Sequence, residues 1–104
     1  MKILHVMLSR LSLPPKDYGG TERIVWGLLM AQQAAGHEVR LLWGNAPELP
    51  SNATRFDPTK SMREQIGSWP DIVHFHQPFV GELDVPYIST EHGNAAVSYT
   101  HLRA

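Results

Sequence analysis

Apolar residues gather in short segments of this chain, and their spacing changes from one segment to the next. Residues 2–8 are almost continuously apolar, which is typical of a parallel strand covered on both faces. From Thr21 to Gly36 the apolar positions recur at helical spacing and predict a helix of roughly four turns, with Thr21 as its N-cap and Gly36 as its stop. Residues 37–43 then predict a second strand, which completes a βαβ unit.

The second half of the chain carries weaker patterns. Met62, Ile66 and Trp69 share one helical face and predict a short helix over residues 60–68, which Pro70 prevents from continuing. Three further segments have the composition of strands: a short one around Arg55 and Phe56, residues 71–76, and residues 86–90. Strands that alternate with helices predict an α/β fold, a Rossmann-like, doubly wound and mostly parallel sheet.

Polar and glycine-rich segments follow the predicted strands at one edge of the sheet. In an open parallel sheet, ligands bind beyond the carboxyl ends of the strands. Four segments reach that edge: the loop with Gly19 and Gly20, the loop after Trp43, His76 with Gln77, and His92 with Gly93. The topology therefore predicts one polar site, built from loops that are distant in sequence.

Composition limits the partners that this protein takes. The 104 residues make one small domain, and 42% hydrophobic with 18% charged residues is ordinary for a globular protein. The net charge of -1 and the lack of any run of Lys or Arg argue against nucleic acid or a polybasic membrane surface as the main partner. Without cysteine the chain has no disulfide and no thiolate nucleophile, which is compatible with a reducing cytosol.

Gly19 and Gly20 stand between the first predicted strand and the helix. Adjacent glycines let the main chain approach a ligand closely, and the N–H groups that open a helix attract an anion such as phosphate. The alternative is a tight turn that only needs positive φ angles, and the spacing alone leaves this open. Lys16 and Arg23 flank the pair and would add positive charge, although solvated surface charge is the default for both.

Four segments have an order and spacing that together are specific. They are residues 14–23 (PPKDYGGTER), 36–39 (GHEV), 70–76 (PDIVHFH) and 90–93 (TEHG). Over residues 1–94 they resemble the N-terminal domain of the family 4 glycosyltransferases. The resemblance implies the N-terminal half of a GT-B architecture, in which an acceptor-side domain faces a C-terminal donor-binding domain. Such enzymes transfer a sugar with retention, without a metal or other cofactor, from a UDP- or GDP-sugar to a glycan, lipid or small-molecule acceptor.

The resemblance also implies roles for single residues. Gly19 and Gly20 match the glycine loop that reaches toward the donor diphosphate. His92 matches a cleft histidine near the donor sugar and is the catalytic candidate, with hydrogen bonding favoured over acid–base work. Glu22 follows the glycine loop closely enough to contact the acceptor or the loop backbone, and His76 is expected to line the cleft.

The part of the family pattern that binds the donor has no counterpart in this chain. Residues 1–94 are therefore predicted to be an incomplete acceptor-side domain that is inactive alone, and residues 95–104 look like a tail of doubtful origin. A sheet without its covering partners is expected to be only marginally stable. The intact enzyme is expected in the cytoplasm or at the membrane periphery.

The remaining histidines and tryptophans leave alternatives open. His74 and His76, two apart on one strand, share a face and would make a metal pair if His92 or Glu91 completed it. The favoured interpretation has no metal: His74 is packed and hydrogen-bonded in the sheet, and His5 is structural. The three tryptophans are likewise expected in the core rather than stacked on a sugar.

Two rival functions remain. A sugar-nucleotide epimerase of similar architecture would act on the nucleotide-sugar itself and need no acceptor. A non-enzymatic nucleotide- or sugar-binding module is favoured only if the gene ends near Ala104 and the short protein folds stably. A dinucleotide-dependent oxidoreductase is disfavoured, because the loop lacks the G-x-G-x-x-G fingerprint and Trp43 and Gly44 stand where an acidic residue would end the second strand.

Overall fold

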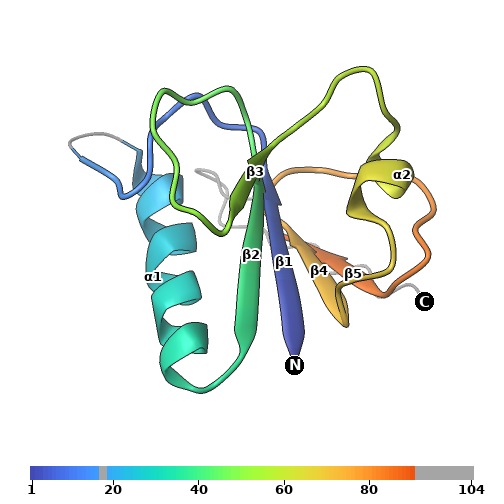
Figure 1. Cartoon of the computed structure of the whole chain (residues 1–104), viewed down its shortest axis with the longest axis horizontal. Coiled ribbons are helices and arrows are strands. Elements are labelled where there is room, and N and C mark those ends of the chain that lie inside the picture. The colour runs from blue at the N-terminus through green and yellow to red at the C-terminus, as the bar shows by residue number, and fades with distance from the viewer. Residues whose placement is uncertain (17–18, 91–104) are drawn as a thin grey trace.

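The computed structural model describes residues 1–16 and 19–90, which contain a five-stranded sheet whose neighbouring strands are all parallel. The strands are β1 (Lys2–Met7), β2 (Glu38–Trp43), β3 (Ala53–Arg55), β4 (Ile72–Phe75) and β5 (Tyr87–Ser89), and the helices are α1 (Gly20–Ala34) and α2 (Met62–Ile66). The strand order is β3-β2-β1-β4-β5. In Figure 1, α1 lies on one side of the sheet and α2 on the other. The predicted α/β fold with a parallel sheet is therefore confirmed.

β1 is the central strand, and its sequence shows why. It pairs with β2 along one edge, beginning at Lys2↔Glu38, and with β4 along the other, beginning at Ile3↔Ile72. Residues 3–6 are all buried. A strand that is paired on both edges and covered on both faces needs a nearly continuous apolar run, which is the pattern at this position.

Two apolar clusters hold the helices against the sheet, one on each face. The cluster under α1 has the buried members Ile3, Leu13, Val25, Leu29, Val39, Leu41, Trp43 and Ala46. The cluster under α2 has the buried members Leu4, Val6, Leu42, Ile66, Val73, Phe75, Val85 and Tyr87. Burying one large aliphatic side chain contributes about 1.5–3 kcal/mol, so these clusters are the main source of stability.

Glycines set both ends of α1. The sequence predicts Thr21 as the N-cap, and this is wrong: Gly19 is the N-cap, with φ 94° and ψ 75°, and the helix begins at Gly20. Glycine adopts this left-handed conformation without steric cost, so the backbone rather than a side chain decides the start. At the other end, Gly36 has φ 94° and donates its N–H to the Gln33 carbonyl at 3.0 Å. The predicted stop at Gly36 is confirmed.

α2 is shorter than the helix predicted over residues 60–68. Ser61 caps it, since its hydroxyl oxygen accepts a hydrogen bond from the Glu64 N–H at 3.0 Å. The chain leaves the helix through Gly67, which has φ 64°, and Ile66 is the buried residue that anchors it to the sheet.

Of the helices in the described part of the chain, none is long and apolar enough to cross a membrane.

The tryptophans lie in or against the two clusters, as predicted. Trp43 is fully buried, and its indole N–H donates to the Leu11 carbonyl at 2.9 Å. Trp26 and Trp69 are partly buried at the margins. The Arg40 guanidinium covers the Trp69 ring at 4.0 Å from its centroid. These contacts account for the three rings without a bound sugar.

Candidate functional site

The carboxyl ends of β1 and β4 lie next to each other near the middle of the sheet. β2 and β3 lie on one side of β1, whereas β4 and β5 lie on the other, so the strand order reverses between β1 and β4. Ligands of open parallel sheets bind at such a reversal. The N-terminal end of α1 lies at the same end of the sheet (Figure 1), and His76 directly follows β4. The fold therefore brings the glycine loop and His76 to the predicted edge.

Gly19 and Gly20 are adjacent but differ in why they are glycine. Gly19 has φ 94°, and a Cβ there would collide with the Glu22 carboxylate and lie 2.7 Å from Leu11 Cδ1. A Cβ on Gly20 would meet nothing within 4 Å. Folding therefore requires glycine at position 19 and not at position 20. The need for a tight turn with positive φ explains the glycine at position 19, whereas the free space at Gly20 is what a close approach of a ligand would require.

The first turn of α1 offers main-chain donors at this edge. An α-helix leaves its first N–H groups without an intrahelical acceptor, and here the bond from the Arg23 N–H to the Gly19 carbonyl, 3.0 Å long, begins the helical pattern. Gly19 has no side chain that could cap these groups. The aligned peptide dipoles add partial positive charge. The turn therefore offers donors of the kind that bind an anion such as phosphate.

Glu22 packs against this turn and is 8% exposed. Ser9 Oγ donates to Glu22 Oε2 at 2.7 Å and accepts from the Leu11 N–H at 3.0 Å. The carboxylate thereby ties the segment after β1 to the first turn of α1. The bond to the Ser9 hydroxyl is neither of the two contacts predicted for Glu22, so contact with the loop backbone or with an acceptor stays a prediction.

The two basic residues beside the loop contact the protein itself. Arg23 Nη2 donates to the Lys16 carbonyl at 2.9 Å, and Lys16 Nζ lies 3.5 Å from the Glu48 carboxylate in an exposed pair. An exposed pair of this kind contributes about 0–1 kcal/mol. Arg23 therefore fastens the glycine loop from the helix side, and the positive character of the site comes chiefly from the helix.

Known proteins do not supply a function for this edge of the sheet. No protein-family model, curated protein or solved structure matches this chain. The motifs, the fold and the contacts described here are therefore the basis for inferring what the site does.

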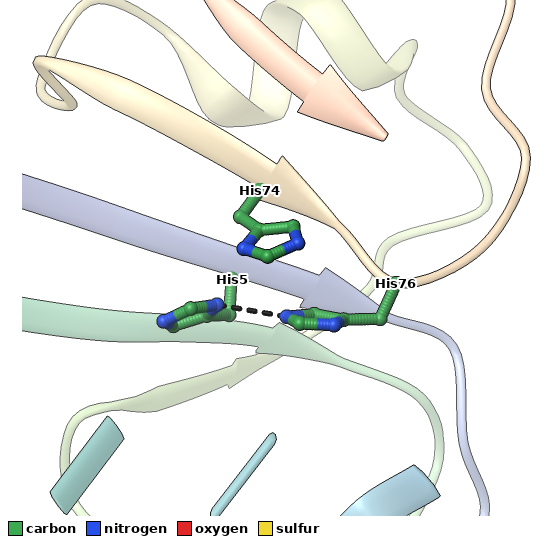
Figure 2. A group of neighbouring side chains, drawn as sticks. All are labelled: His5, His74 and His76. Atoms are coloured by element: carbon green, nitrogen blue, oxygen red, sulfur yellow. Dashed lines mark hydrogen bonds between the residues drawn. The ribbon is translucent and has the colours of Figure 1, made fainter. Parts of the chain in front are cut away.

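A cluster of three histidines lies beneath the same edge, at the boundary between β1 and β4 (Figure 2). His5 on β1 pairs in register with His74 on β4, and His76 follows β4. His5 Nδ1 is 2.9 Å from His76 Nε2. The rings of His74 and His76 are stacked with centroids 4.0 Å apart, and the His5 ring lies 5.4 Å and 5.0 Å from them.

Hydrogen bonds around the cluster set the protonation of its rings. His5 Nε2 is 2.7 Å from Gln32 Oε1 of α1, and because an amide oxygen only accepts, His5 carries its proton on Nε2. His5 Nδ1 then accepts from His76 Nε2–H. His74 Nε2 is 2.9 Å from Thr90 Oγ1. Burial lowers the pKa of His5, and the bond to Gln32 opposes this lowering only in part.

The protein is expected to lose stability as the pH falls below about 6.5, the ordinary pKa of histidine. The pKa of His5 is lower in the folded state than in the unfolded state. Below pH 6.5, His5 is therefore protonated in the unfolded chain while it is still neutral in the folded protein. The unfolding free energy then falls by up to about 1.4 kcal/mol per pH unit until the pH reaches the folded pKa of His5. Urea unfolding at several pH values between 7.5 and 5 measures this slope.

The His37→Asn variant is the control for this pH dependence. His37 directly precedes β2 and lies outside the cluster. Its Nδ1 atom is 3.0 Å from the N-terminal amine of Met1. The variant is expected to keep the slope below pH 6.5. A free energy of unfolding that stays constant or rises from pH 7 to pH 5 would contradict the role given to His5.

The structure describes some of the other residues that the sequence analysis singled out, but not all of them. His92, the catalytic candidate, lies outside the described residues, as do Glu91 and the tail 95–104. His74 is half-buried and hydrogen-bonded in the sheet, as predicted. His76 is 4% exposed, and its place in a cleft stays a prediction. His5 is buried as expected of a structural residue, but the sequence did not show that it joins His74 and His76.

A separate groove of about 400 Å³ lies on the other face of the sheet. Its lining carries both signs of charge, from Arg40, Arg55, Lys60, Asp57 and Glu64. None of the residues predicted for a site lines it. Because its charges do not favour one class of ligand, the carboxyl edge of β1 and β4 is the stronger candidate.

Proposed function

We propose that this chain is the N-terminal, acceptor-side domain of a GT-B glycosyltransferase similar to family 4. The intact enzyme transfers a sugar, with retention, from a UDP- or GDP-sugar to a glycan, lipid or small-molecule acceptor. The observation that carries the proposal is the place of Gly19 and Gly20, which open α1 at the edge where the strand order reverses. The four sequence motifs supply the reaction class.

Main-chain groups perform the proposed chemistry. Sugar transfer leaves negative charge on a nucleoside diphosphate, and N–H donors held in place at a helix start stabilise that charge. The left-handed Gly19 and the Ser9–Glu22 hydrogen bond hold the turn in position, and the open space at Gly20 admits the diphosphate. His92 is proposed to hydrogen-bond near the donor sugar.

The donor site itself belongs to a second domain in this proposal. Closure of two domains around the donor is what excludes water and completes such a site. The 104 residues alone are therefore proposed to be inactive, and the intact enzyme to work in the cytoplasm or at the membrane periphery. Transfer of sugar to any acceptor by the 104-residue chain would contradict the need for a second domain.

Pyrophosphate is expected to bind at the start of α1. The amide signals of Gly19, Gly20 and Thr21 should shift in ¹H–¹⁵N NMR spectra as inorganic pyrophosphate is added at millimolar concentration. The Gly20→Ala variant should keep its folded stability, because the new methyl group meets nothing within 4 Å, and should bind pyrophosphate about fivefold more weakly. Unshifted loop signals, or equal binding by the variant, would contradict the diphosphate site.

The reaction is tested on the protein that the full reading frame encodes. Sequencing the source DNA past codon 104 shows whether the frame continues into a donor-binding domain, and the product of that frame is assayed with UDP- and GDP-sugars. A glycosylated acceptor supports the transferase. An altered nucleotide-sugar without an acceptor supports the epimerase, and binding without any product supports the binding module.

A further inference from the structure

The geometry points to a binding site for a divalent transition-metal ion, such as Zn²⁺, formed by His5, His74 and His76. One ring nitrogen from each residue lies within 4.8 Å of the other two. Figure 2 shows the rings gathered between β1 and β4, with His5 and His76 joined by a hydrogen bond. Within residues 1–16 and 19–90 the third ligand is thus His5, whereas the His92 and Glu91 considered from the sequence lie outside these ranges. The inference goes beyond the proposed function, which needs no metal.

The spacing of two of the nitrogens is close to what a metal ion requires. Zn–N bonds of about 2.0–2.1 Å at tetrahedral angles place two ligand nitrogens about 3.3 Å apart. His5 Nδ1 and His76 Nε2 are 2.9 Å apart. An ion that replaces their shared proton therefore needs the two nitrogens to separate by about 0.4 Å and both rings to tilt so that their lone pairs point at the ion. The His74 ring, 25° from the plane of His76, has to turn about its side-chain bonds to direct its nitrogen at the ion.

The rings of His5 and His74 are each hydrogen-bonded to an oxygen outside the cluster, as the histidine ligands of metal sites usually are. A ligating histidine usually donates its other N–H to an oxygen that fixes the ring. Gln32 Oε1 does this for Nε2 of His5, which leaves Nδ1 facing the cluster. Thr90 Oγ1 lies 2.9 Å from His74 Nε2 and helps to fix the orientation of that ring.

The ligand set selects the class of cation. Imidazole nitrogens suit Zn²⁺, Co²⁺ and Ni²⁺, whereas Mg²⁺ and Ca²⁺ require oxygen ligands. Within the described residues, the group contains three histidines and no carboxylate. His5 is fully buried, and burial favours the neutral imidazole that binds metal. A bound ion would join β1 to β4 beneath the candidate functional site.

Cobalt and zinc titrations of the full chain test the site. We expect one Co²⁺ per chain, with visible absorption bands that Zn²⁺ abolishes, and Zn²⁺-dependent shifts of the ring signals of His5, His74 and His76 in NMR spectra. His74→Asn and His76→Asn should each weaken Zn²⁺ binding about tenfold or more. His37→Asn is the matched control, since it removes an imidazole outside the cluster and should leave the affinity unchanged.

Three results would overturn the metal site. They are no binding at about 1 mM of either ion, ring shifts confined to other histidines, and an affinity that both cluster variants retain. Urea unfolding without metal shows whether each variant folds, and the ring shifts of the unsubstituted chain decide the question if one does not. Pyrophosphate binding at Gly20 is measured separately, so failure of the metal site leaves the proposed function standing.

Discussion

Replacing Gly44 by alanine is expected to lower the free energy of unfolding by about 3 kcal/mol. Gly44 is buried directly after β2, and a Cβ there would collide with the Ser9 carbonyl oxygen and lie 2.8 Å from the carbonyl carbons of Leu8 and Ser9. These are main-chain atoms, so the whole segment after β1 would have to shift to make room. Since domains of this size are stable by about 5–15 kcal/mol, the loss is large, and the urea midpoint measures it.

Gly27→Ala is the matched control for this substitution. Gly27 is exposed in the middle of α1, and a Cβ there would meet nothing within 4 Å. Alanine is the better helix former, so this variant is expected to raise the free energy of unfolding by about 0.5–1 kcal/mol. The same change thus has opposite signs at the two sites. Equal urea midpoints for the two variants would show that the contact between Gly44 and Ser9 does not constrain the fold.

Trp43→Ala is expected to cost about 3–5 kcal/mol of unfolding free energy. The ring is fully buried in the cluster under α1, so its removal leaves a cavity. The substitution also removes the indole donor to the Leu11 carbonyl, which holds the segment leading to the glycine loop. Calorimetry and urea unfolding both report the loss.

Trp69→Ala is the control for Trp43→Ala. It shows how much unfolding free energy is lost when an indole is removed from a site that is not fully buried. Trp69 is half-buried, with the Arg40 guanidinium over its ring, and its removal should cost about half as much as that of Trp43. If Trp43→Ala instead kept full stability, the core assignment would be wrong, and sugar stacking would again have to be considered.

Local patterns were sufficient for most elements of the fold. β1 and α1 were predicted because continuous burial and helical spacing leave distinct signals over six and fifteen residues. β3 was shifted and α2 was too long in the prediction, since elements of three and five residues carry too few side chains to show a period. The N-cap was missed because Thr21 has the better capping side chain, while the conformation of Gly19 depends on its neighbours in space.

The candidate site was predictable only in outline. The glycine loop and His76 could be placed at one edge because parallel strands all end there. That Glu22 bonds to Ser9 could not be predicted, because the two residues lie on segments separated by the loop between β1 and α1. The collision of a Cβ on Gly19 with the Glu22 carboxylate follows from where that bond holds the carboxylate. His5 was a lone polar residue in an apolar strand, and its sequence position says nothing of its partners.

The sequence by itself determined the α/β class, the parallel sheet and the glycine that stops α1, because these follow from short-range periodicity and from the conformational freedom of glycine. The tertiary structure alone decided which residues meet. The pairing of β1 with β4 sets His5 beside His74, and the packing of α1 on the sheet brings Gln32 to His5. Strand order and register are set by burial summed over the whole sheet, and no local segment contains that information.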